Sequence, residues 1–237
     1  MTWSIIARDE ATGRIGIAVA TRFFAVGSRV PHIRTGVGAV ATQAMTNPYF
    51  GPRGLALLAA GTSGLDTVRM LLADDDGRDH RQIHVMDKDG TFAAATGGDC
   101  IPWCGHIVRA TFSVAGNMLV GPEVIEATAE TFAATPEKPF ARRLLAAMQA
   151  GEAKGGDKRG RQSAALLIHD TDDFPILDLR VDDHAAPLDD LQRLEKVARE
   201  RFVHFRRFGP TKDNPTGMLD RSELEAAVGR SIEEGYE

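Results

Sequence analysis

The chain has only two cysteines, Cys100 and Cys104, among its 237 residues. Two cysteines cannot form a disulfide framework that stabilises a chain of this length, and their scarcity is typical of proteins in a reducing compartment. Long apolar runs are also missing. Segment 3–7 is too short for a signal peptide, and no later run approaches the length of a membrane span. We therefore expect a cytoplasmic protein without a membrane partner.

An excess of positive charge is missing as well, because 33 Asp and Glu outnumber 28 Lys and Arg and give a formal net charge of −5. Binding to nucleic acid needs a concentrated basic surface that neutralises phosphates. Basic residues do cluster at 154–161 and 199–207, but acidic residues flank both clusters, as on a solvated face. We expect no nucleic-acid partner.

The sequence does contain a regular series of strand and helix patterns. Apolar runs bounded by turn residues predict strands at 2–8, 14–21, 36–42, 82–87, 91–96, 163–168 and 176–181, with one or two more in 106–115. Apolar residues at helical spacing predict helices at 51–60, 65–73, 122–134, 140–149 and 187–208, and a weaker one at 221–230. Gly151 is expected to end the fourth helix.

The order of these elements predicts the fold class. The strands come as hairpins and do not alternate with helices, which argues against a doubly wound parallel sheet. We expect an α+β fold, a four-layer αββα sandwich of two antiparallel sheets. A single domain would cover residues 1–208, followed by a polar C-terminal extension at 209–237. The apolar stripe of the 187–208 helix would also allow a homodimer.

Thr2 is the first residue that could carry chemistry. Methionine before a small residue is commonly removed, and a freed Thr2 would hold a hydroxyl nucleophile and an amine base in one residue. Many proteins begin with Met-Thr, so this feature alone is weak evidence for a catalytic threonine.

Two amides follow the predicted strand at 36–42, at a turn that leads into a helix. Backbone N–H groups at such a turn, together with Gln43 or Asn47, could stabilise an oxyanion. The same stretch contains Asn47-Pro48 and Gly51-Pro52, which also read as ordinary turn residues.

Cys100, Cys104 and His106 could be three metal ligands, but zinc sites usually have tighter cysteine spacing and a fourth ligand. We expect core packing here, with no metal and no cofactor. Asn117, in a Gly-Asn turn, could face a pocket or simply adopt a left-handed backbone.

The segment 155–165 is rich in glycine and charge and leads into an apolar strand. It lacks the spacing of a phosphate-binding loop. Its charged residues, with Asp157, Arg161 and Ser163 as candidates, could line the site of an anionic small-molecule substrate, or the segment could be a solvated connector.

Seven motifs in order resemble one prokaryotic family, catalogued as domain of unknown function 1028. They lie at 2–9, 24–28, 38–43, 51–55, 100–103, 116–119 and 156–164, and the resemblance extends from residue 2 to about residue 184. That family is placed among the N-terminal-nucleophile hydrolases, which implies an αββα sandwich and a nucleophile at Thr2.

The resemblance also suggests supporting residues. Arg29 is the nearest counterpart of the lysine that tunes the nucleophile, and Asp157 with Ser163 resembles a late Asp–Ser pair. The acid expected at the end of the second strand is absent, since Thr21-Arg22 stands there. The resulting hypothesis is an amidohydrolase with Thr2, Arg29 and Asp157 as its catalytic set. The alternative is a small-metabolite-binding protein on the same fold.

Overall fold

The computed structural model describes residues 2–235, and the chain divides into two compact units, 1–191 and 192–237. The division falls within helix α5 (Pro187–Glu200), earlier than the boundary at 208/209 that the sequence suggested. The single long helix expected over 187–208 is wrong. Arg201, with φ −152°, interrupts it and separates α5 from α6 (Phe202–Arg206).

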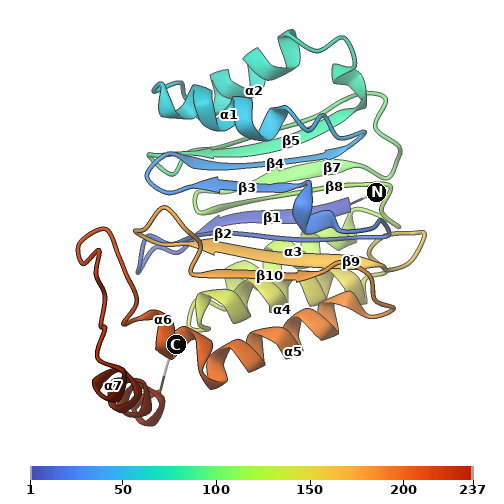
Figure 1. The fold of residues 1–237 in the computed structure, drawn as a ribbon. Helices are drawn as coiled ribbons and strands as arrows, with labels where there is room; N and C mark the ends of the chain where they lie inside the picture. The colour runs from blue at the N-terminus through green and yellow to red at the C-terminus, as the bar shows by residue number, and fades with distance from the viewer. Residues whose placement is uncertain (1, 236–237) are drawn as a thin grey trace. The chain divides into compact units, whose positions relative to one another are not determined.

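Two antiparallel sheets form the centre of the first unit (Figure 1). One has six strands in the order β10-β9-β2-β1-β8-β7, and the other has four in the order β3-β4-β5-β6. The six strands are β1 (Thr2–Arg8), β2 (Ile15–Thr21), β7 (Gly105–Val108), β8 (Phe112–Asn117), β9 (Ser163–His169) and β10 (Leu177–Val181). The four are β3 (Pro31–Arg34), β4 (Gly38–Ala44), β5 (Arg81–Asp87) and β6 (Phe92–Thr96).

Helices cover the outer faces of both sheets (Figure 1). Helices α1 (Phe50–Ala59) and α2 (Gly64–Ala73) pack on the four-stranded sheet, and α3 (Glu123–Ala134) and α4 (Phe140–Ala153) pack on the six-stranded one. Two short 3₁₀ helices, η1 (Val26–Ser28) and η2 (Arg78–His80), lie in the connections. The unit is the four-layer α+β sandwich that the hairpin order predicted.

Alternation along β1 decides which side chains face which layer. Ile6 belongs to the apolar cluster between the sheets, and Ser4 hydrogen-bonds to Gln43 of the other sheet. Trp3 points the other way, toward α4, where a side chain at Gly151 would meet its Nε1. Thr2 therefore shares the inter-sheet face with Ser4 and Ile6.

Two details of the sequence prediction are corrected. Strand β3 was missed because it has only four residues and begins with Pro31, which is tolerated at a sheet edge. Helix α4 does not end at Gly151 but continues to Ala153. Gly151 lies inside the helix, where any side chain would collide with Thr128 Oγ1 of α3.

The second unit contains α6 and α7 (Arg221–Glu234), which is longer than the 221–230 predicted. Asp220 caps α7 by accepting hydrogen bonds from the backbone of Ser222 and Glu223. His204 Nδ1 lies 2.8 Å from Ser231 Oγ and connects α6 to α7. Within residues 2–235, none of the helices combines the length and the apolar character that crossing a bilayer requires.

Candidate functional site

Four polar residues meet at one end of the six-stranded sheet because adjacent antiparallel strands begin or end there. Thr2 opens β1 and is paired with Asn117, the last residue of β8. Thr21 closes β2 and is paired with Ser163, the first residue of β9. Thr2 is 7% exposed, and its Oγ1 donates a hydrogen bond to Thr21 Oγ1 over 3.2 Å. Met1 lies outside the described residues.

Two buried amides hold the backbone of Thr2. Its carbonyl oxygen lies 3.3 Å from Asn117 Nδ2 and 3.4 Å from Gln43 Nε2. Gln43 Nε2 is closer to Gln82 Oε1, at 2.7 Å, and to Ala115 O, at 3.1 Å. Because an amide nitrogen carries two hydrogens, Gln43 is already engaged inside the protein and would have to give up a bond to contact an oxyanion.

A chain of buried hydrogen bonds continues behind Thr2 between the two sheets. Ser4 Oγ donates to Gln43 Oε1 over 2.7 Å and lies 2.8 Å from His84 Nε2. A hydroxyl has one hydrogen, so Ser4 must accept from His84 Nε2–H. Nδ1 of the ring is then the acceptor, and Ser113 Oγ donates to it over 2.8 Å. Desolvation, assisted by the charge of His106, lowers the pKa of His84 to about 3.

The sequence interpretation missed Gln82 and His84. They alternate along β5 with Ile83, which packs toward α1 and α2. That alternation was visible in the sequence. In an antiparallel sheet with one solvated face, however, the polar side chains of a strand would point into solvent. Here the six-stranded sheet covers that face, so the polar side chains of β5 point into the interior.

Asp157 fastens the glycine-rich loop to the end of β2. Its side chain is 1% exposed, and Oδ2 accepts a 2.6 Å hydrogen bond from the backbone N–H of Arg22. Oδ1 accepts from the backbone of Arg159 over 2.9 Å, and the Arg159 guanidinium pairs with the carboxylate at 3.2 Å. The structure therefore shows Asp157 as an anchor for this loop beside the Thr2 group.

Ser163 also positions a loop. Its Oγ donates to Phe23 O over 2.6 Å and accepts from Val26 N over 3.1 Å. These two bonds fix the segment after β2, which presents Phe23 and Phe24 with 59% and 60% of their surfaces exposed.

Three predicted site residues have other surroundings. Asn47 donates to Asp75 Oδ2 over 2.9 Å; hydrogen bonds from Arg81 and Asn47 hold the pKa of Asp75 well below its usual value. Arg161 Nε lies 3.4 Å from Glu152 Oε1. Arg29 has an exposed side chain, and within the described part of the chain its hydrogen bonds are formed by its backbone.

A cleft of about 470 Å³ adjoins this group, and Asn117 and Arg159 form part of its wall. Three of its side chains are apolar and about half exposed or more: Phe23, Met45 and Ile101. Apolar side chains that line a cleft with a few polar groups are typical of a small-molecule site.

Backbone strain is concentrated in the same wall. Ala44 and Met118, which both line the cleft, have φ angles of 70° and 53°. Left-handed conformations cost a residue with a side chain roughly 1–2 kcal/mol, and strain of this kind is typically found at functional sites. His80 Nε2 lies 3.7 Å from Asp99 Oδ2 at this cleft, so its wall also contains an imidazole and a carboxylate.

The two cysteines form local hydrogen bonds. Cys100 Sγ donates to Arg81 O over 3.3 Å, Cys104 Sγ donates to Cys100 O over 3.4 Å, and burial raises the pKa of both thiols. His106 Nδ1 lies 2.9 Å from Thr96 Oγ1. Within residues 2–235, no three His, Cys, Asp or Glu side chains are grouped so that they could hold a metal ion.

Comparison with known proteins shows to which family the chain belongs. A family model described as a family of unknown function, DUF1028, matches residues 2–191. The chain belongs to this family. A crystal structure of a member from Silicibacter pomeroyi is similar at 34% sequence identity with a TM-score of 0.86, covering 93% of this chain and 96% of that one.

More distant structural similarity was also found. Anbu from Yersinia bercovieri, named as an ancestral beta-subunit, has 12% identity and a TM-score of 0.39 over 88% of this chain and 98% of its own. A mutant of Anbu from Hyphomicrobium sp. strain MC1 has 14% identity and a TM-score of 0.45 over 85% and 96%. A search of curated proteins gave no significant match.

Proposed function

We propose that this member of the family is an amidohydrolase of the N-terminal-nucleophile type that acts on a small amide-containing metabolite, with Thr2 as the nucleophile after removal of Met1. One observation carries the proposal. The Thr2 hydroxyl lies where four strand ends bring polar residues together, and Asn117, which holds the Thr2 carbonyl, also lines the 470 Å³ cleft.

The reaction would run in two steps. Thr2 Oγ1 attacks the amide carbon while the freed α-amine, through a water molecule, takes the hydroxyl proton. The C–N bond then breaks, the amine product leaves with that proton, and an ester remains on Thr2. Water attacks the ester in the second step, releases the acid and returns a proton to the Thr2 oxygen.

The neighbouring residues would position this reaction. Asn117 would hold the strand end that carries Thr2, while Thr21 would orient the nucleophilic hydroxyl across 3.2 Å. Asp157 would keep Arg159 at the wall of the cleft, where its charge would favour an oxyanion. Arg29 has no part in this scheme because its exposed side chain has no contact with the Thr2 group among the described residues.

Substitution of Thr2 tests the proposal. In a panel of small amides, Thr2→Ala should reduce hydrolysis by several orders of magnitude, because only a hydroxyl can form the ester, while Thr2→Ser should retain part of the activity. The stability of Thr2→Ala should fall by about 1 kcal/mol, since the hydrogen bond between the Thr2 and Thr21 hydroxyls is lost. An Ala variant with normal turnover, verified as free of wild-type protein, would rule out Thr2 as the nucleophile.

A second candidate is a protein that binds a small metabolite in the same cleft without cleaving it. The observation in its favour is that Thr21 stands at the end of β2, where the family resemblance leads us to expect an acid, and accepts the hydrogen bond of the Thr2 hydroxyl. Calorimetry separates the two. If ligands bind with unchanged affinity to wild-type and Thr2→Ala protein and are recovered intact from both, the binding function is the correct one.

A further inference from the structure

Gln82 is a fully buried amide that connects the two sheets behind Thr2. It lies on β5 opposite Gln43 of β4 and is 0% exposed. Its Nε2 lies 2.8 Å from Gly116 O of β8 and 3.1 Å from Gly105 O of β7, and both strands belong to the other sheet. Because it is buried, Gln82 can act on the Thr2 group only through its neighbours.

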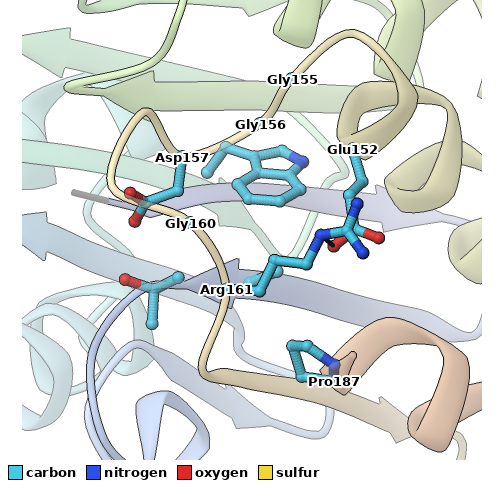
Figure 2. Close-up of a pocket in the computed structure, with 10 residues that line it drawn as sticks. Glu152, Gly155, Gly156, Asp157, Gly160, Arg161 and Pro187 are labelled. Carbon is cyan, nitrogen blue, oxygen red and sulfur yellow. Dashed lines mark ion pairs between the residues drawn. The ribbon is translucent and has the colours of Figure 1, made fainter. Parts of the chain in front are cut away.

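The end of β1 that carries Thr2 is packed from the opposite face of the sheet. Trp3 is 2% exposed, and a side chain at Gly156 would come within 3.1 Å of its ring. Figure 2 shows the glycine-rich loop, from Gly155 to Gly160, around a small pocket that Trp3 also lines. This packing fixes β1 at residue 3, so the direction of the preceding Thr2 carbonyl depends on hydrogen bonds between the sheets.

The surroundings of Gln82 determine which end of its amide is the donor. Backbone carbonyl oxygens only accept hydrogen bonds, so the atom that faces Gly105 O and Gly116 O must be the NH₂ group. Thr96 Oγ1, at 2.9 Å, is a third acceptor for the two hydrogens of this nitrogen. Oε1 of Gln82 is therefore the acceptor and lies on the side of the Thr2 group.

This oxygen orients the two amides that hold Thr2. Gln43 Nε2 donates to Gln82 Oε1 over 2.7 Å, and Asn117 Nδ2 donates to it over 2.9 Å. The same two nitrogens lie 3.4 Å and 3.3 Å from Thr2 O. Nδ2 of Asn117 has two hydrogens, one for Gln82 and one for Thr2. A flipped Asn117 amide would place its oxygen against both acceptors, and Gln82 prevents this flip.

We propose that Gln82 is a positioning residue for the reaction at Thr2, an inference that rests on the proposed function. By fixing the Asn117 amide, Gln82 fixes the Thr2 carbonyl and with it the directions of the α-amine and the hydroxyl of the same residue. A nucleophile and its base react only within a narrow range of geometries, and a displacement of ~1 Å can slow such a step about a hundredfold. Gln82 therefore governs how fast Thr2 forms its ester.

Gln82→Met tests this role in the full-length protein, because methionine has a similar length but its thioether is only a weak acceptor. The probe is β-propiolactone, whose ring a nucleophile opens without loss of atoms. Intact mass and peptide mapping give the rate of modification at Thr2, and circular dichroism shows that the variant is folded. The rate should fall by about tenfold or more relative to wild type.

The side-chain hydrogens of Asn117 report the positioning directly. In ¹⁵N-labelled wild-type protein these NH₂ signals, identified by their absence from Asn117→Asp, should exchange with water much more slowly than those of the exposed Asn214. In Gln82→Met their exchange should accelerate by about tenfold or more, because one acceptor is lost. If Gln82→Met does not fold, the wild-type measurement decides: Asn117 hydrogens that exchange as fast as those of Asn214 overturn the inference.

Thr96→Val is the matched control, because Gln82 Nε2 keeps two carbonyl acceptors for its two hydrogens when the Thr96 hydroxyl is removed. It should change the rate of Thr2 modification by less than about twofold. Equal losses in Thr96→Val and Gln82→Met overturn the inference. Equal rates in wild type and Gln82→Met contradict the role of Gln82 alone, whereas a wild-type protein that gains no lactone at Thr2 contradicts the proposed function as well.

Discussion

His84 is a neutral imidazole in a fully buried position, and its pKa near 3 makes the stability of the protein depend on pH. In the unfolded chain this ring takes up a proton near pH 6.5, whereas in the folded protein it stays neutral until about pH 3. Between these values the unfolded state binds more protons, so the free energy of unfolding must fall as the pH falls. This histidine should contribute a slope of up to about 1.4 kcal/mol per pH unit.

Urea unfolding of wild-type and His84→Gln protein between pH 7 and 4 measures that contribution. His32 and His169 also have lowered pKa values and are present in both proteins, so their contributions cancel in the comparison. The difference between the two proteins therefore reports His84 together with its coupling to His106. The variant should show lower stability at pH 7 and a shallower pH dependence. Identical slopes for the two proteins would mean that His84 is not held neutral.

Phe23 and Phe24 are neighbours with nearly equal exposure, but only Phe23 lines the cleft. If the cleft receives an apolar part of the substrate, Phe23→Ala should lower kcat/KM by about tenfold through lost apolar contact, and Phe24→Ala should change it less than twofold. Steady-state kinetics with the best amide from the panel provides the comparison. Equal losses in the two variants would exclude Phe23 from substrate binding.

At the scale of elements, the contact between β2 and α4 depends on a glycine. A side chain at Gly16 would come within 2.6 Å of Leu144 Cδ1 and 2.9 Å of Phe140 Cε1. Gly16→Ala should therefore destabilise the fold by about 1–3 kcal/mol, because overpacking forces the helix away from the sheet.

Gly98→Ala is the corresponding control, since the space around Gly98 is open and the residue is exposed. It should change the free energy of unfolding by no more than about 0.5 kcal/mol. Urea denaturation of both variants tests the packing; a Gly16→Ala protein as stable as wild type would show that α4 does not approach β2 so closely.

Periodicity predicted most elements because their apolar residues repeat over seven or more positions, as in β1 and α2. Periodicity predicted the wrong helix boundary where the intrinsic helix propensity of a residue and the packing around it favour different structures. Gly151 has low helix propensity but remains inside α4, because its lack of a side chain lets α4 approach Thr128 of α3. The break at Arg201 carries neither glycine nor proline, so the sequence gives no sign of it.

At the scale of the whole molecule, the candidate site is a product of strand order. Thr2 and Asn117 are 115 residues apart in sequence and lie side by side because β1 pairs with β8. The sequence identified both residues as candidates, Thr2 from its position in the chain and Asn117 from its Gly-Asn turn. It could not show that they are neighbours, nor that Gln43 is hydrogen-bonded to Gln82, because those contacts depend on which strands pair within each sheet, β1 with β8 and β4 with β5.

If Thr2 is a free N-terminal nucleophile, a small β-lactone should modify it, and the intact mass of the treated protein shows whether it does. The Thr2 oxygen would add to the lactone carbonyl, the ring C–O bond would open, and the proton would pass to the released alkoxide, so no atoms are lost. We expect the mass of the chain without Met1 plus one lactone, located at Thr2, for wild-type and Thr2→Ser protein but not for Thr2→Ala. Retained Met1, or an adduct that persists in Thr2→Ala, would contradict it.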